Sequence, residues 1–572
     1  PIFFMSGITG RFIQEIPKIV VLTLIMSLFE SLVILPSHIA HGPKIAPKKL
    51  EWFDKAKSYY GNLISWVFKH RAKTVIFFTV FLISSVSLFH FKMKFILFPY
   101  SDADIFYVLA ELPEGTPLLA TSKKMNQVED IVAEISDDEM VSYTTRIGHH
   151  HVDVYSSETG AGKENWALIT VYLKLAEYRE RNSELIIKEV EGKLKNRIKG
   201  FTRLDVMKFY DGPPVGRPLT LRLVSDNNSL RENYRDKIFN YLKEIKGVKN
   251  LELDASEGKE ELRVRPIYDK MNRLGVTSDT LSQTIRMAFE GVVATSITRE
   301  GEEIDFRVKV NPGPSDGIEI LNKLQVPNNI GRLIDVKSFV EIKKVKSVNT
   351  ITHFKGRRSV TIYGDVDEKV ITSKEINRLV GDKFSKKIAK ESGISLIFGG
   401  EEKATKESLK SLGIAFCLTF IAIYFTLSIL FNSTWQPFLI LSAIPFGLCG
   451  VIISFYFHGV AVSFFAMIGA MGLMGILVND GLIMVSHLNQ LTKENGLNET
   501  TLIQGSKDRF RAVMLTTIST VAGMIPTIYG FGGEQPFLVP LVLAIAGGLI
   551  FGTIITLILI PLLYSFKLKE VL

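Results

Sequence analysis

The chain alternates between long apolar runs and one long polar block. A run of about 20 apolar residues is long enough to cross the hydrocarbon core of a bilayer as a helix. The polar block, 92–408, lies between the second and third of these runs. The pattern predicts a membrane α-helical bundle of seven transmembrane helices with a large soluble portion. The seven runs are 16–39, 73–91, 410–431, 437–458, 462–488, 512–530 and 537–564.

Inside the polar block, short runs typical of β-strands alternate with helical patterns. A first β-α-β unit has a strand at 105–112 and a helix at 116–135. A second unit opens with a strand at 219–224 and resumes with a strand at 359–364, after an insertion, about 256–352, that has strands of its own. The block therefore predicts two α+β units, the second split by a smaller domain.

The formal net charge of +9 is concentrated beside the apolar runs. Lysines and arginines crowd the segment 41–73, and more follow at 493–511 and 567–569. Basic loops of this kind stay on the cytoplasmic side of a membrane. They place the block 92–408 on the opposite, periplasmic face, and they explain the positive charge without a nucleic-acid partner.

Two similar steps, Leu35–Pro36 and Ile560–Pro561, each end an apolar run and suggest an internal repeat. Transporters are often built from such repeats, although two steps of this kind also coincide by chance. We expect a chain cut out of a longer one, with the last helix of a first repeat and a complete second repeat. Its parts would be a helix in 1–40, a basic amphipathic linker in 41–72, a helix in 73–102, the soluble block, and five helices in 403–572.

A polar pair, Asn479 and Asp480, interrupts the apolar run 462–488. A charged side chain at that depth costs at least about 2.5 kcal/mol, so it usually faces a helix bundle or water and marks an ion path. Gly469, Gly472 and Gly475 recur at a spacing that lets a second helix approach closely. The alternative is that Asp480 is a hydrogen-bonded structural residue or lies near the headgroups.

Two further features of the apolar runs each allow two interpretations. Glu30, within the run 16–39, is either a second titrating group or a structural acceptor that stays protonated. Met467, Met471 and Met474 are at helical spacing, and thioethers can pass Cu(I) although such stripes more often pack in a core.

Catalytic signatures are missing from the sequence. It contains no Walker motif, nucleophile elbow or zinc-protease pattern, so ATP hydrolysis is not supported and we do not expect an enzyme. The two cysteines, Cys417 and Cys449, lie in apolar runs and form neither a disulfide framework nor a metal spacing.

Taken in order, several motifs resemble those of the resistance–nodulation–division (RND) superfamily, specifically multidrug efflux permeases of the AcrB type. Each motif is modest alone, and their order and spacing across essentially the whole chain make the resemblance strong. The motifs are SLFESLVILPSH at 27–38, FPYSDAD at 98–104, the glycines and glutamate of 399–401, GILVNDGLIMV around Asn479, the Arg509–Phe510–Arg511 step, and the helix start AVMLTTISTVAGMIP.

This resemblance implies a fold and partners. The chain would be the C-terminal part of a twelve-helix protein of the bacterial inner membrane, driven by protons as the coupling ion, without another cofactor. It would form a homotrimer in the lipid bilayer with a periplasmic adaptor protein and an outer-membrane channel. The periplasmic porter subdomains would be 103–212 and, split, 213–255 with 353–402, and the docking or funnel subdomain would be 256–352.

The resemblance also implies a proton relay. Asn479 matches the family's relay position on the tenth helix, where lysine is common, and Arg509 and Thr516 match positions on the eleventh. The family's aspartate pair on the fourth helix has no counterpart in this chain. Protonation there would loosen hydrogen bonds to Asn479 and Thr516 and rock the helices. Alternatively, Arg509 is a positive-inside anchor and Thr516 an ordinary helix hydroxyl.

A loop at 148–165 resembles the family's switch loop beside the drug pocket. Thr144, His149 and His151 stand where better-known pumps carry phenylalanines, so a substrate path there would be less aromatic. Three adjacent histidines do not share a face, and no metal site is expected from them. An exposed loop is the alternative.

We predict the C-terminal part of a proton-driven RND transporter that exports lipophilic or amphiphilic compounds from the inner membrane or periplasm. The first alternative is an RND heavy-metal exporter. Others are a non-transporting membrane fragment or scaffold, and a membrane-anchored periplasmic enzyme, for which the sequence offers no catalytic constellation.

Overall fold

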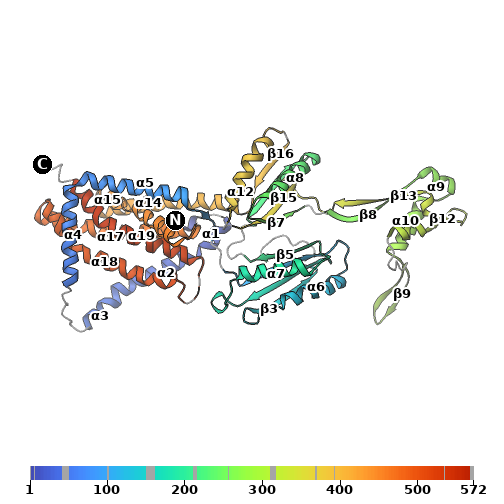
Figure 1. The fold of residues 1–572 in the computed structure, drawn as a ribbon, viewed down its shortest axis with the longest axis horizontal. Helices are drawn as coiled ribbons and strands as arrows, with labels where there is room; N and C mark the ends of the chain where they lie inside the picture. The colour runs from blue at the N-terminus through green and yellow to red at the C-terminus, as the bar shows by residue number, and fades with distance from the viewer. Residues whose placement is uncertain are drawn as a thin grey trace.

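The structure, a computed structural model, places a helical bundle at one end, two sheet units in the middle and a small unit at the far end (Figure 1). It describes residues 2–5, 7–41, 51–98, 102–149, 162–209, 216–254, 257–309, 317–348, 350–367, 370–391, 393–531, 533 and 535–566.

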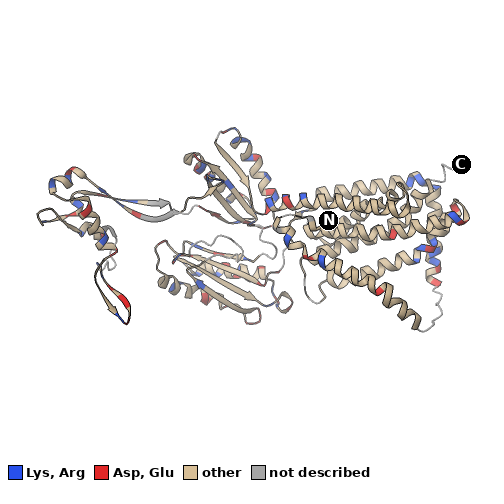
Figure 2. Ribbon diagram, turned by 180° about the vertical axis from the view of Figure 1, so that it is seen from behind, with Lys and Arg blue, Asp and Glu red and all other residues tan. Residues whose placement is uncertain are grey.

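Within these residues, seven helices are long and apolar enough to cross a membrane. That each of them does so stays a prediction. Lys and Arg gather at the two ends of the bundle, whereas its middle carries few charged residues (Figure 2). The helical segments are Thr9–His41 (α1 to α3), Arg71–Lys92 (α5), Glu401–Phe431 (α14), Gln436–His458 (α15 and α16), Phe464–Asn495 (α17), Glu499–Ile528 (α18) and Leu538–Tyr564 (α19).

Helix α19 is the centre of the bundle, and small residues let its neighbours approach it. A Cβ atom on Gly548 would lie 2.1 Å from a Leu473 methyl group of α17. A Cβ atom on Gly469 of α17 would lie 2.3 Å from the Leu541 carbonyl oxygen of α19. The close approach predicted at the glycine face of α17 therefore occurs at Gly469. It does not occur at Gly475, because a Cβ atom added there would have no atom of a neighbouring helix within 4 Å.

The helix formed by α2 (Glu15–Phe29), a π-helical turn (Glu30–Ile34) and α3 (Leu35–His41) leaves the bundle. No residue of these three segments is buried. In Figure 1 this helix diverges from α18 toward its C-terminal end. Only the start of α2 packs on the bundle, through the partly buried Ile16. The exposed apolar remainder is compatible with lipid around it.

A separate helix, α4 (Glu51–Lys69), runs across the end of the bundle that points away from the sheets (Figure 1). Its buried residues Tyr60, Ile64, Val67 and Phe68 belong to the same core cluster as residues of α17, α18 and α19. One face of an amphipathic helix is thus packed on the bundle, as the composition of the predicted linker suggests.

The first sheet unit has four antiparallel strands in the order β3-β4-β2-β5. Helices α6 (Leu118–Val132) and α7 (Ser183–Arg197) contribute to its apolar core. Strand β3 was not predicted, because its residues do not alternate between apolar and polar. The strands are β2 (Ile105–Glu111), β3 (Met140–Ile147), β4 (Trp166–Leu173) and β5 (Arg203–Lys208).

An ion pair stabilises this unit where β3 begins. The Arg181 guanidinium donates hydrogen bonds of 2.6 and 2.5 Å to the two carboxylate oxygens of the buried Glu139. These hydrogen bonds hold the pKa of Glu139 below its usual value of 4.5. Arg181 also pairs with Glu189 at 2.5 Å.

The second sheet unit is assembled from two distant stretches of the chain. Strand β15 pairs with β6 in antiparallel register, with Ser359 opposite Val224. Helices α8 (Asn228–Glu244) and α12 (Ser373–Val380) share a core with this sheet. The strands are β6 (Leu219–Ser225), β7 (Val248–Leu253), β14 (His353–Phe354), β15 (Arg357–Val366) and β16 (Ile394–Phe398).

The insertion projects from this second unit. Strands β8 and β13 form a two-stranded antiparallel ladder that carries a small domain at its far end (Figure 1). That domain has a core around Met271, Leu281 and Phe339, and a hairpin, β9–β10, whose residues are all exposed. The elements are β8 (Glu257–Pro266), α9 (Tyr268–Leu274), α10 (Ser278–Phe289), β9 (Val292–Arg299), β10 (Glu302–Val308), α11 (Gly317–Lys323), β11 (Gln325–Pro327), β12 (Leu333–Asp335) and β13 (Val340–Val348).

Candidate functional site

Asp480 of α17 is the buried carboxylate of the bundle. Its residue is 3% exposed, and the hydroxyl groups of Thr516 from α18 and Thr553 from α19 face its carboxyl group. Within the described part of the chain, its Oδ2 atom has no hydrogen-bond partner and no cation forms an ion pair with it. Three helices thus meet at one carboxyl group with unused hydrogen-bonding capacity.

A pair of threonines extends this polar layer. The Thr517 hydroxyl of α18 lies 2.7 Å from the Thr553 hydroxyl of α19, and both side chains are buried. Thr517 is also within hydrogen-bonding distance, 3.1 Å, of the Val513 carbonyl oxygen. We call Asp480, Thr516, Thr517 and Thr553 the Asp480 cluster.

The Asp480 cluster has a physical basis in its apolar surroundings. A carboxylate at such depth requires hydrogen bonds or a cation, and hydroxyl groups are the partners supplied here. Because a hydroxyl can donate or accept, threonines can adapt to a carboxyl group with or without its proton. The arrangement is thus suited to a proton site.

Asn479, the neighbour of Asp480, faces outward. Adjacent helical residues point about 100° apart, so the polar pair of the sequence is divided between two faces. Asn479 is exposed, as are Gly472 and Gly475 on the same helix. It forms no hydrogen bond with Thr516 or Asp480 in the described structure.

Arg509 lies two helical turns before Thr516 on α18, about 10 Å along the axis. It is half-buried, and its Nε atom has no hydrogen-bond partner among the described residues. The structure therefore brings Thr516, but not Arg509, to Asp480.

Glu30 lies where α2 ends, in the exposed helix that leaves the bundle. The structure does not bring it to the Asp480 cluster.

The predicted substrate-path residues lie in the first sheet unit. Thr144 is an exposed residue of β3, opposite Thr170 of β4, and His149 follows the same strand and is half-buried. His151 lies outside the described residues. The path itself stays a prediction.

No group of three His, Cys, Asp or Glu residues within the described ranges is arranged to hold a metal ion. The methionines of α17 contribute to the packing of the bundle. Met474 and Met471 are buried in two different core clusters, and Met467 packs against the cluster that contains Met471.

Sequence reasoning missed Thr517 and Thr553. Thr553 and Thr556 are the two threonines of the very apolar helix α19, and no periodic pattern marks either of them as a site residue, although a hydroxyl group in such a run is itself a signal.

Long apolar helices, paired sheet units and a buried membrane carboxylate together define a multi-pass membrane protein of the transporter class. A sequence profile of the AcrB/AcrD/AcrF family matches residues 1–567, and the chain belongs to this family. The resemblance stated for the sequence is thereby confirmed.

Two curated relatives are similar over nearly the whole chain. The swarming motility protein SwrC of Bacillus subtilis is 24% identical over 588 residues, which cover 100% of this chain and 53% of SwrC. The multidrug resistance protein MdtC of Photorhabdus laumondii is 24% identical, covering 99% of this chain and 54% of MdtC. The chain thus spans about half the length of these relatives.

A crystal structure of a heavy metal efflux pump has a similar fold. It aligns with a TM-score of 0.73 and 18% sequence identity, covering 91% of this chain and 53% of the pump. At this identity the likeness shows the fold alone.

Proposed function

We propose that this chain is the C-terminal part of a proton-driven efflux permease, in which Asp480 binds and releases the coupling proton. The observation that carries the proposal is the Asp480 cluster, a buried carboxyl group surrounded by hydroxyls from two other helices. Ionisable residues buried in this way typically mark proton or ion pathways.

A direct connection joins α17 to the soluble part. Just before α17 begins, Val462 and Ser463 (β17) pair in parallel with Phe95 and Ile96 (β1), which lead toward the first sheet unit. The Val462 amide donates to the Lys94 carbonyl at 3.1 Å, and the Phe464 amide donates to the Leu97 carbonyl at 3.2 Å. In the proposal, these hydrogen bonds transmit a movement of α17 to the strand entering the first sheet unit.

The proposed cycle uses these parts in order. When Asp480 gains or loses a proton, its hydrogen bonds with Thr516 and Thr553 change and α18 and α19 shift against α17. The β1–β17 pair passes the shift to the sheet units, which act as porter subdomains. The ladder of β8 and β13 holds the docking subdomain.

Asn479 and Arg509 have roles beyond this cluster in the proposal. Asn479 lies on an exposed bundle face, where the additional helices of a protein twice this length would pack. Arg509 would join the relay from a position on α18 two helical turns before Thr516. Glu30 is proposed as a separate titrating group.

The proposed cargo and partners are those that membership of the family suggests. We infer export of lipophilic or amphiphilic compounds from the inner membrane or the periplasm, past Thr144, His149 and His151. The assembly would be a homotrimer with a periplasmic adaptor and an outer-membrane channel. Relatives named for multidrug resistance support this cargo class.

Proteoliposomes that contain the full-length protein test the proposal. An imposed pH gradient should drive export of an amphiphilic dye by the wild type and not by Asp480→Asn. Thr426→Val, which removes an exposed hydroxyl of α14 bonded to its own helix, is the matched control and should keep export. Export by Asp480→Asn at the wild-type rate would overturn the proposal.

A further inference from the structure

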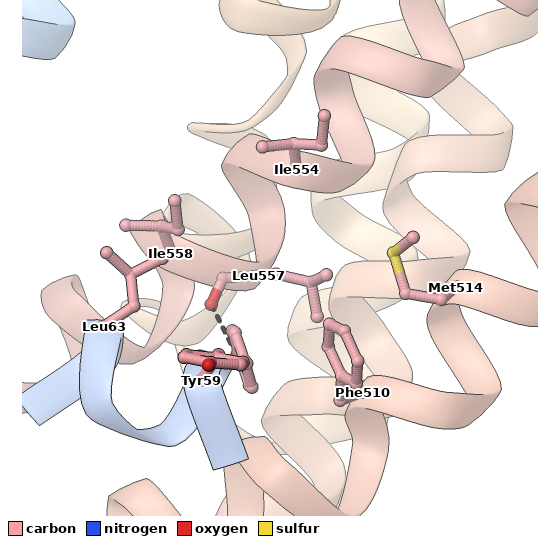
Figure 3. A pocket seen from close by; sticks show the side chains of 8 residues that line it. Tyr59, Leu63, Phe510, Met514, Ile554, Leu557 and Ile558 are labelled. Carbon is pink, nitrogen blue, oxygen red and sulfur yellow. Dashed lines mark hydrogen bonds between the residues drawn. The ribbon is translucent and has the colours of Figure 1, made fainter. Parts of the chain in front are cut away.

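A cavity of about 310 Å³ lies between α4 and the bundle, outside the Asp480 cluster. Figure 3 shows side chains from α4, α18 and α19 surrounding it. This volume is at the small end of the range for ligand pockets. Its lining residues are Tyr59, Tyr60, Leu63, Phe510, Met514, Ile554, Leu557 and Ile558.

The cavity offers almost nothing polar to a ligand. The buried Tyr60 hydroxyl donates to the Leu557 carbonyl oxygen at 2.8 Å, so this phenol is already occupied. The Phe510 ring stacks on Tyr60 with centroids 4.7 Å apart, and Met514 adds a flexible thioether. Hydrocarbon is therefore the matching chemistry.

The cavity extends from the end of the bundle toward its middle. Phe510 and Met514 lie one turn apart on α18, and Leu557 and Ile554 lie about one turn apart on α19, so the walls span at least about 5 Å along the helices. The mouth is open, because Tyr59 is 75% and Ile554 51% exposed. A chain-like ligand can thus enter from the side of the bundle.

The exposed face of α4 carries the side chains of a membrane interface. Trp52, Tyr59 and Trp66 recur every seven residues, which places them on one face of the helix, and all three are largely exposed. Trp and Tyr prefer the level of the headgroups. This aromatic stripe places the cavity mouth at the boundary between headgroups and acyl chains.

Basic side chains lie on the parts of α4 and α18 that border the cavity. The Arg511 guanidinium lies 5.8 Å from the centre of the Phe53 ring, and Phe53 in turn contacts Phe510. Arg511 is exposed and forms no ion pair with any described residue. Lys57 pairs with Asp508 at 3.2 Å, with both side chains about one-third exposed. The stem of Lys507 lies against Gly61.

We propose that this cavity binds one acyl chain of an anionic phospholipid, whose phosphate group contacts Arg511 and Lys57. Arginine binds phosphate oxygens with two parallel hydrogen bonds, and lysine adds a point charge. The lipid would fasten α4 to α18 and α19. The proposal does not depend on proton coupling, since a pump that transports nothing would still bind it.

Native mass spectrometry of the purified full-length protein tests this proposal. Phosphatidylglycerol and phosphatidylcholine with identical chains would be added at equal concentration. We expect phosphatidylglycerol to bind about fivefold more tightly, the size of effect that one nearby basic residue produces. Equal binding of the two lipids would overturn the headgroup assignment.

Two pairs of variants test the binding of the acyl chain and the recognition of the headgroup separately. Ile554→Trp fills the mouth and should abolish binding of both lipids at this site, whereas Ile550→Trp, one turn earlier on α19 and outside the lining, should leave it. Arg511→Gln should remove the preference for phosphatidylglycerol, whereas Lys493→Gln, an exposed lysine of α17, should keep it. Tight binding that survives Ile554→Trp would show that the cavity is not the site. A transported dye that displaces the lipid would assign the cavity to cargo and overturn the proposal.

Discussion

The Thr517 hydroxyl of α18 lies 2.7 Å from the Thr553 hydroxyl of α19, in the layer where Asp480 of α17 is buried. This contact joins two helices through groups that carry no charge. Thr553 also faces the Asp480 carboxyl group, so it links the pair of threonines to the candidate proton site.

Thr553→Val tests that link, because valine keeps the shape of threonine and removes its hydroxyl group. We expect the free energy of unfolding to fall by about 1 kcal/mol, the usual value for one hydrogen bond. We expect pH-driven dye export to fall several-fold, since the Asp480 carboxyl loses a partner. Thr426→Val again serves as control, and equal export by the two variants would exclude Thr553 from the site.

The glycines of α17 provide a prediction about packing. Gly469→Ala should lower the melting temperature in detergent by several degrees, because its Cβ would lie 2.3 Å from a backbone oxygen, which cannot move cheaply. Gly475→Ala should leave the melting temperature of this 572-residue chain unchanged or slightly raise it, since alanine favours helix. Equal effects would contradict the packing of α17 against α19.

Much of this fold was predictable from hydropathy, since each apolar run lies within a described helix apart from residues at its ends. Helix α14 begins at Glu401, about nine residues before its apolar run. Hydropathy places its start too late because its first turns are polar. Strand β3 was missed because it lacks alternation. The pairing of β15 with β6 fits the prediction of a unit split by an insertion.

The candidate site was less predictable, for a geometric reason. The sequence marks Asn479 and Asp480 equally, and only the rotation of α17 shows that one is exposed and the other buried. Likewise, nothing in the sequence aligns Thr553 with Thr516, because the relative height of two helices depends on their packing. Only the three-dimensional structure shows that these two threonines lie at the same level.

The pair of Glu139 and Arg181 predicts a pH dependence of stability. The hydrogen bonds with Arg181 lower the pKa of Glu139 in the folded state. The ionised carboxylate therefore adds to the free energy of unfolding above the unfolded pKa, and this stabilisation is lost as the pH falls through the folded pKa. Glu139→Gln should therefore lower the melting temperature of the first sheet unit at pH 7. The effect should shrink as the pH falls below about 4.

Glu184→Gln is a suitable comparison, because Glu184 is more exposed and pairs with Lys188 within its own helix. Exposed pairs of this kind contribute little. A Glu139→Gln penalty that stayed constant from neutral to acidic pH would mean that the loss arises from packing.

The connection between β1 and β17 predicts that a cross-link there is harmless. Phe95 lies opposite Val462 in parallel register, so cysteines at both positions are within disulfide distance. In a Cys417→Ser, Cys449→Ser background, the Phe95→Cys, Val462→Cys disulfide should form and leave export intact, because the two strands are proposed to move together. Loss of export on oxidation, reversed by reduction, would show that these strands separate during the cycle.

The central claim is that Asp480 exchanges a proton. Infrared difference spectroscopy of the reconstituted protein observes this directly, by comparing spectra at acidic and alkaline pH. The account predicts a carboxyl C=O band that titrates, shifts in Thr553→Val because a hydrogen bond is lost, and disappears in Asp480→Asn. A spectrum that Asp480→Asn leaves unchanged would contradict it.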